Sequence, residues 1–166
     1  MIEELKKNIY ENNSKEVLKL IEIIGNEKNE LALPILLDLF ETTDDSILRN
    51  KIALALSDIG NSMVVEPIIK MIFNPKAQRS RGTLIYSLNN FECSQYTKLF
   101  INLLSDRSLE VSREAFSLIE SNHKNITNAD KNDCLKSIAE EIEFINDRLE
   151  LLYETYELFS DKKEET

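Results

Sequence analysis

The chain has 166 residues, a formal net charge of −10 and only three glycines and three prolines. One domain of this size can bury a substantial core, and so few turn residues argue against a β-rich fold. The negative charge argues against nucleic acid and anionic membranes as partners, because both attract positively charged surfaces. No segment has the length of a membrane span or the pattern of a signal peptide, so we expect a cytoplasmic protein.

The N-terminal segment, residues 1–13, predicts a short amphipathic helix, because Ile2, Leu5 and Ile9 share one helical face. We expect this helix to cap a series of helical hairpins over residues 14–122. The whole chain is then a single domain.

Residues 46–73 give the clearest hairpin, with apolar residues at three- and four-residue spacing in both halves. Asp45 or Ser46 can cap the first helix, and Gly60 can end it in the left-handed conformation. Ser62 can cap the second helix, and Pro75 follows its end.

The hairpin recurs when the sequence is shifted forward by about 32 residues or back by about 33 to 35. Shifted forward, Arg81 falls on Arg49; shifted back, Ile24-Gly25 falls on Ile59-Gly60. Each hairpin is too short to be stable alone and must bury its apolar face against a neighbour. The periodicity therefore predicts an all-α fold, a short α-solenoid of about three to four hairpins.

The segment LRNKIALALSDIG, followed by a short turn and VVEPIIKMI, resembles the HEAT-like repeats named after phycobilisome lyases. These repeats have an aliphatic–Arg start, an Ala-rich middle and an Ile–Gly end, and the resemblance covers roughly residues 14–121. It departs from the pattern where Gly60 has no equivalent after Phe91 and where Ser14 replaces an Arg.

In repeats of this kind an early Arg bridges to acids in the turn of the neighbouring repeat. The resemblance therefore implies an internal ladder made by Arg49, Arg81 and Arg113, in preference to a ligand site. It also implies one alternative function, a phycobilin-lyase-like enzyme.

A long amphipathic helix is predicted over residues 129–160, with Thr127 and Asp130 at capping-box spacing. Steps of three and four residues define an apolar seam with heptad spacing, made by Leu135, Ile138, Ile142, Ile145, Leu149, Leu152, Tyr156 and Phe159. A second stripe consists of Phe144, Leu151 and Leu158. We expect this helix to close the solenoid, with its second apolar side covered either within the molecule or by a partner helix. Residues 161–166 are expected to form a frayed tail.

Residues for catalysis or metal binding are sparse. His123 is the single histidine, and no Cys-x-x-Cys, His-Glu-x-x-His or Gly-rich phosphate motif occurs. Cys93 and Cys134 lie far apart and are interpreted as reduced thiols. We therefore expect no enzyme activity, no cofactor and no metal.

The function that the sequence favours is a non-catalytic protein-binding module with a basic protein partner. The size, charge and expected fold of this chain are similar to those of bacterial immunity proteins, which neutralise secreted toxins. The many Asn, Lys, Ile and Glu residues are typical of proteins from AT-rich bacterial genomes. The main alternative is a scaffold that homodimerises through the long helix. The expected partner-binding residues are Asp38, Glu41, Glu66, Lys70, Asn74, Arg79, Lys98, Asn102, Glu143, Phe144, Leu151, Glu154 and Leu158.

Overall fold

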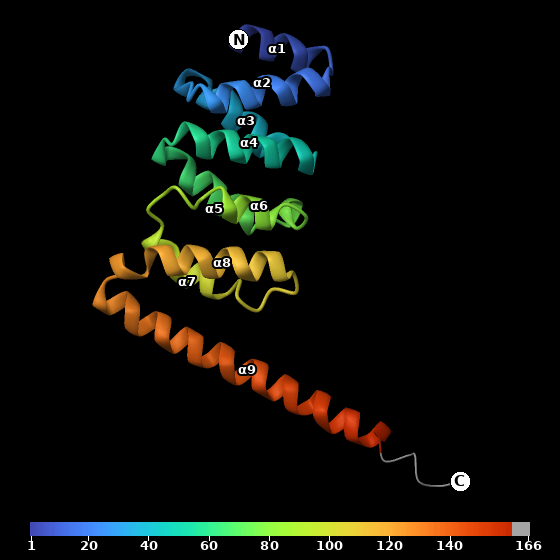
Figure 1. The fold of residues 1–166 in the computed structure, drawn as a ribbon, viewed down its shortest axis with the longest axis vertical. Coiled ribbons are helices and arrows are strands. Elements are labelled where there is room, and N and C mark those ends of the chain that lie inside the picture. The colour runs from blue at the N-terminus through green and yellow to red at the C-terminus, as the bar shows by residue number, and fades with distance from the viewer. Residues whose placement is uncertain (161–166) are drawn as a thin grey trace.

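The computed structural model describes residues 1–160 (Figure 1), so the tail expected at 161–166 lies outside the described residues. All regular structure in residues 1–160 is helical, which confirms the all-α expectation. The α-helices are α1 (Ile2–Tyr10), α2 (Ser14–Asn26), α3 (Leu33–Thr42), α4 (Ser46–Ile59), α5 (Val65–Ile72), α6 (Arg81–Tyr86), α7 (Thr97–Ile101), α8 (Leu109–Asn122) and α9 (Asn128–Ser160). Short 3-10 helices are η1 (Glu30–Ala32), η2 (Ser62–Val64), η3 (Pro75–Ala77), η4 (Ser94–Tyr96) and η5 (His123–Asn125).

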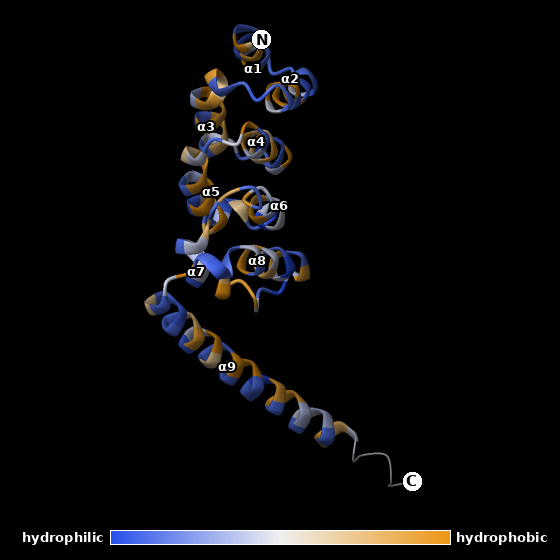
Figure 2. Ribbon diagram, turned by 60° about the vertical axis from the view of Figure 1, so that its left-hand side comes forward, coloured by the Kyte–Doolittle hydropathy of each residue, from blue (hydrophilic) through white to orange (hydrophobic). Residues whose placement is uncertain are grey.

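Helices α2, α4, α6 and α8 lie side by side in one row, and α3, α5 and α7 form a second row beside it (Figures 1 and 2). Helix α1 packs against α2 at the N-terminal end. We call α1 to α8 the helical body. The body is held together by neighbour-to-neighbour packing, because each helix mainly contacts the next one in its row or its partner in the other row.

The core of the helical body lies between the two rows. Phe40, Ile52, Leu56, Ile68 and Phe100 are completely buried there. Each buried side chain of this size contributes roughly 1.5–3 kcal/mol by leaving water. The three- and four-residue spacing seen in the sequence therefore corresponds to the buried faces of the helices.

Local capping follows the sequence closely around α4. The Asp45 carboxylate accepts the backbone N–H groups of Ile47 and Leu48 at 2.8 and 3.3 Å. Gly60 ends the helix at φ 78°, in the left-handed conformation.

The predicted Ser62 cap is wrong. A 3-10 turn over Ser62–Val64 precedes α5, so helical backbone begins earlier than the apolar pattern indicates. Asn61 is the capping residue instead, and its side-chain oxygen accepts the Met63 N–H at 3.1 Å. Asn29 and Asn74 cap η1 and η3 in the same way.

Helix α9 differs from all the others. Its first part packs against α7, and the helix then diverges from the body (Figure 1). Cys134 is its one buried residue among those described. The long helix predicted over 129–160 is thus present. The expectation that it closes the solenoid is not met over most of its length, because only its first part packs on the body and most of its surface is in solvent.

Candidate protein-interaction surface

Helix α9 begins at a capping box, as the sequence predicts. The Thr127 hydroxyl accepts the Asp130 N–H at 3.2 Å and donates to the Asp130 carboxylate at 2.6 Å. One turn further on, the buried Cys134 anchors the helix where it packs on α7. These contacts help to fix the direction in which α9 leaves the helical body.

Beyond those turns, the apolar residues of α9 are exposed. Within the apolar seam Ile138 is half-buried, and the other members have exposed fractions from 44% at Leu149 to 75% at Phe159. The second stripe is exposed to a similar degree. The hydrophobic residues lie along the side of α9 that faces the helical body, with hydrophilic residues on the outer side (Figure 2). Single exposed apolar residues are ordinary on a protein surface, whereas a continuous apolar side of a helix marks an interaction surface.

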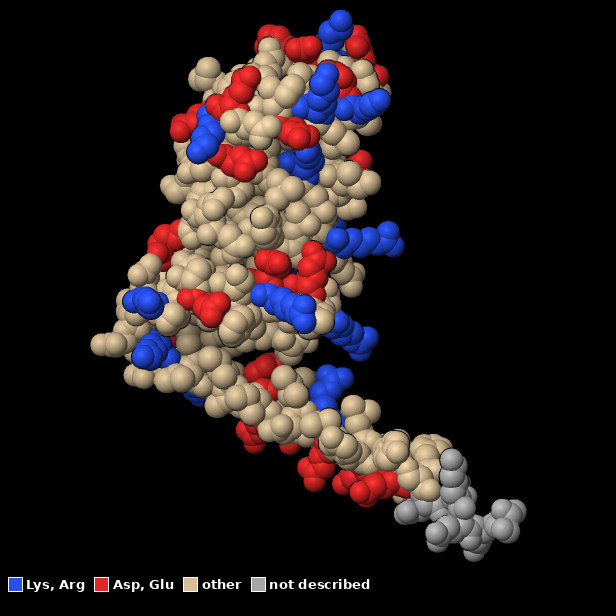
Figure 3. Space-filling model, viewed as in Figure 1, with Lys and Arg blue, Asp and Glu red and all other residues tan. Residues whose placement is uncertain are grey.

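A groove of about 310 Å³, which we call the end groove, opens between α9 and the end of the helical body (Figure 3). Ser105 and Arg107, in the connection between α7 and α8, form one wall. The other wall is made by Phe144, Ile145, Arg148, Leu149 and Leu152 of α9. The apolar residues of α9 thus face an open groove that has a cationic residue on each wall.

Two charged residues on the apolar side of α9, Glu141 and Arg148, each contact a different neighbour. Glu141 accepts a hydrogen bond from the Ser105 hydroxyl and is half-buried. The Arg148 guanidinium lies 5.2 Å from the centroid of the Phe144 ring, a cation–π distance. The charges on the apolar side of α9 are therefore few, and they lie at defined positions.

The outer side of α9 is acidic, and Figure 3 shows Asp and Glu side chains along the edge that faces away from the body. This acidic edge consists of Asp133, Glu140, Glu143, Asp147, Glu150, Glu154 and Glu157. Within residues 1–160, Glu140 is the one member with an ion pair, to Lys136 at 3.8 Å. The acidic edge thus carries charge that the described part of the chain leaves largely unneutralised.

The other residues expected to bind a partner lie mostly on the second row. Asp38 and Glu41 are exposed on α3, Lys98 is exposed on α7, and Asn102 is exposed directly after α7. Arg79 is exposed before α6.

Within this second row, Glu66 pairs with Lys70 on α5 at 2.9 Å. Hydrogen bonding and charge attraction in this pair lower the pKa of Glu66 and raise that of Lys70. Asn74 is half-buried, and its side-chain oxygen caps η3. The charged residues on α3, α5 and α7 are of both signs. The acidic edge of α9 is therefore the more uniformly negative of the two surfaces.

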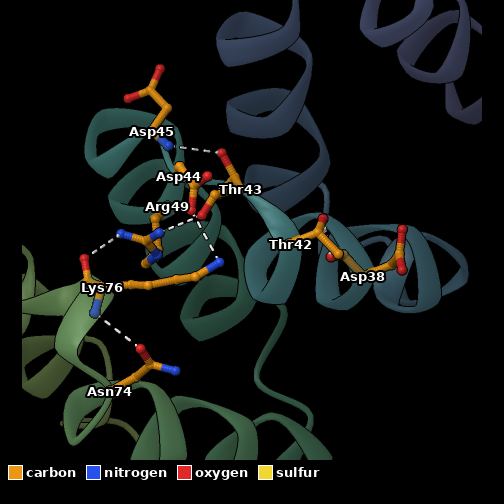
Figure 4. A network of polar contacts seen from close by, with 8 residues as sticks. All are labelled: Asp38, Thr42, Thr43, Asp44, Asp45, Arg49, Asn74 and Lys76. Carbon is orange, nitrogen blue, oxygen red and sulfur yellow. Dashed lines mark hydrogen bonds and ion pairs between the residues drawn. The ribbon is translucent and has the colours of Figure 1, made fainter.

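The buried Arg49 has a structural role (Figure 4). Its guanidinium is completely buried and donates to the carbonyl oxygens of Thr43 and, at 3.2 Å, Lys76. The Lys76 ammonium pairs with Asp44 at 3.0 Å. Arg49 thereby links the turn before α4 to the turn before α6.

The expected arginine ladder is confirmed at one of its three positions. Arg81 pairs with Asp106, an acid in the turn before α8, at 2.6 Å. The prediction of an acid partner is wrong for Arg49, because the neighbouring turn, residues 73–80, contains no acid and supplies the Lys76 carbonyl oxygen instead. Arg113 is exposed and forms no ion pair with residues 1–160.

Both cysteines are free and buried. Burial, with a smaller contribution from the Glu92 charge, raises the pKa of the Cys93 thiol to about 11. Burial and the Asp130 charge raise the pKa of Cys134. His123 is exposed, and its Nδ1 lies 2.6 Å from the Glu120 carbonyl oxygen. Among residues 1–160, no group of three or more His, Cys, Asp or Glu side chains is placed to hold a metal ion.

No protein-family model matches this chain, and no curated protein sequence matches it significantly. No helix within residues 1–160 is long and apolar enough to cross a membrane.

The sequence prediction included Phe144 from the end groove but missed Ser105 and Arg107. Spacing in the sequence showed that α9 has two apolar stripes, and it could not show which loop lies opposite them. The one signal in the sequence for a groove on this helix was Arg148. It is the single basic residue between Lys136 and the end of α9 at Ser160.

Proposed function

We propose that this protein is a non-catalytic protein-binding module, a short α-solenoid of HEAT-like hairpins in which α9 is the binding element. The observation that carries the proposal is the continuous apolar side of α9, exposed over most of the helix and facing the end groove. Exposing such a surface has a free-energy cost that a bound protein partner would remove.

The acidic edge of α9 supports a basic protein as the partner. Residues 128–160 contain nine acids and three bases. A helix with this charge attracts a basic partner over long range, and the apolar residues then provide short-range contacts. An immunity protein that neutralises a basic toxin in the bacterial cytoplasm is the biological setting that this combination fits, by analogy of size, charge and fold.

Affinity capture from a bacterial lysate at low salt tests this function. We expect one basic protein to bind in stoichiometric amount and to elute as salt is raised, because the Debye length falls to about 3 Å at 1 M salt. Recovery of no partner, or of one whose binding is independent of salt, would contradict the proposal.

A pair of variants with equal net charge locates the binding surface. The double substitution Glu150→Lys and Glu154→Lys reverses charge on the acidic edge and should slow association about tenfold at low salt. The control is Glu4→Lys with Glu27→Lys, which reverses two exposed charges on α1 and directly after α2. Equal slowing by both variants would show that net charge acts without a specific surface.

A further inference from the structure

We infer that the apolar side of α9 binds α9 of a second copy of this chain, with the two helices antiparallel. This inference rests on the proposed function in one respect, that α9 is a protein-binding element. It adds that the apolar side of α9 binds a second copy of the chain. In such a dimer the apolar side is no longer available to a basic partner, which would bind to the acidic edge alone.

The exposed area is the first argument for a second copy. The exposed members of the apolar seam are Leu135, Ile142, Ile145, Leu149, Leu152, Tyr156 and Phe159. Their side chains together expose roughly 800 Å² per chain, which is the size of one side of a standard protein interface. The seam therefore offers as much area as one side of a standard interface.

The position of the charges beside the seam sets the direction of pairing. In heptad notation, Glu141 and Arg148 both occupy the g position, which flanks the seam and forms ion pairs between helices. In a parallel pair each g residue meets an e residue, so Glu141 would meet Asn146 and Arg148 would meet Tyr153. Neither contact is an ion pair, so a parallel dimer gains nothing from these charges.

An antiparallel pair places g residues beside g residues. When the helices cross between positions 141 and 148, Glu141 of each copy lies beside Arg148 of the other, and two ion pairs form. This crossing point is close to the middle of α9, which spans Asn128–Ser160, so the exposed parts of the two seams overlap, while the first part of each α9 stays packed on its own α7. The charges and the helix length thus favour the same arrangement.

The end groove is consistent with this arrangement. It is lined by Ile145, Leu149 and Leu152 of the seam and by Arg148, with Ser105 and Arg107 of the helical body opposite, so these seam residues are not covered by their own chain. In the antiparallel dimer the C-terminal half of one α9 lies beside the N-terminal half of the other. The two helical bodies are then at opposite ends of the pair, and the two acidic edges point outward.

Light-scattering mass of the full chain, from about 1 to about 200 µM, is the first measurement. We expect the mass to rise from that of one 19.2 kDa chain to that of two. The double substitution Leu149→Glu and Leu152→Glu should weaken dimerisation at least tenfold, because it places charges in the seam. The matched control is Ile47→Glu with Met63→Glu, which adds the same two charges at exposed apolar residues outside α9, 68% and 57% exposed, and should leave the dimer unchanged.

Charge exchange tests the direction of pairing. Glu141→Arg alone and Arg148→Glu alone should each weaken the homodimer about tenfold, because each places like charges together. An equimolar mixture of the two variants should form a heterodimer of near wild-type affinity, since both ion pairs are then restored. Circular dichroism of each variant shows whether α9 remains helical.

The outcomes separate this inference from the proposed function. A constant monomer mass, or a dimer that the Leu149–Leu152 variant does not weaken, overturns the second copy as partner. A dimer without recovery in the mixture overturns the antiparallel arrangement. Capture of a basic protein by a monomeric chain would support the proposed function alone, whereas a dimer that captures no basic partner would support this inference alone.

Discussion

At the scale of single residues, two helical glycines have opposite environments. A Cβ at Gly25 would lie 2.9 Å from the Ala55 Cα, where α2 packs closely on the backbone of α4. A Cβ at Gly82 would overlap only the side chain of Glu110, which is exposed.

The same substitution should therefore have different effects at these two positions. We expect Gly25→Ala to destabilise the fold by about 1–3 kcal/mol, because backbone of α4 must move. Gly82→Ala should change stability by less than about 1 kcal/mol, since Glu110 can move away and alanine favours helix. Urea unfolding followed by circular dichroism measures both, and equal losses would contradict the close α2–α4 packing.

The raised pKa of Cys93 predicts a loss of stability in alkaline solution. The folded chain holds the thiol proton up to a pKa of about 11, whereas the unfolded chain releases it near the usual value of 9.0. The stabilisation is complete below about pH 9 and is lost as the pH rises towards about 11. The urea midpoint should fall over this interval, and it should fall less in the Cys93→Ala variant. A midpoint with equal pH dependence in both proteins would show that Cys93 does not cause the change.

At the scale of elements, Asp106 connects α6 to the start of α8. One carboxylate oxygen binds Arg81 at 2.6 Å, and the other accepts the Ser108 N–H at 2.9 Å. Asp106→Asn keeps the turn but removes the charge, and should cost about 1 kcal/mol. Asp106→Ala removes both interactions and should cost about 1 kcal/mol more. Thermal unfolding of the two variants separates these contributions, and identical midpoints would mean that the turn contact is not stabilising.

The sequence predicted those elements whose signals are local. The Asp45 cap, the left-handed Gly60 and the long helix from the Thr127–Asp130 box all depend on residues within one or two turns. The Ser62 cap failed because apolar spacing does not distinguish a 3-10 turn from the first turn of an α-helix. The end groove was not predictable, because a heptad seam has the same spacing whether the helix packs inside its own molecule or faces solvent.

At the scale of the whole molecule, the fold divides into a body that buries its own core and a helix that does not. Every large, fully buried side chain lies before α9, and α9 itself buries only Cys134 among the described residues. The stability of the body should therefore depend little on the outer part of α9. Dimerisation should depend on that outer part completely.

A chain ended after Ala139 separates these two properties. It keeps Cys134 and the contact between α9 and α7 but lacks most of the seam, so the helical body should stay folded. Its unfolding midpoint should be independent of protein concentration, whereas that of the full chain should rise with concentration because dimerisation stabilises the folded state. Circular dichroism melting at several concentrations measures both midpoints. Loss of the cooperative transition on truncation would show that the outer part of α9 is required for folding of the body.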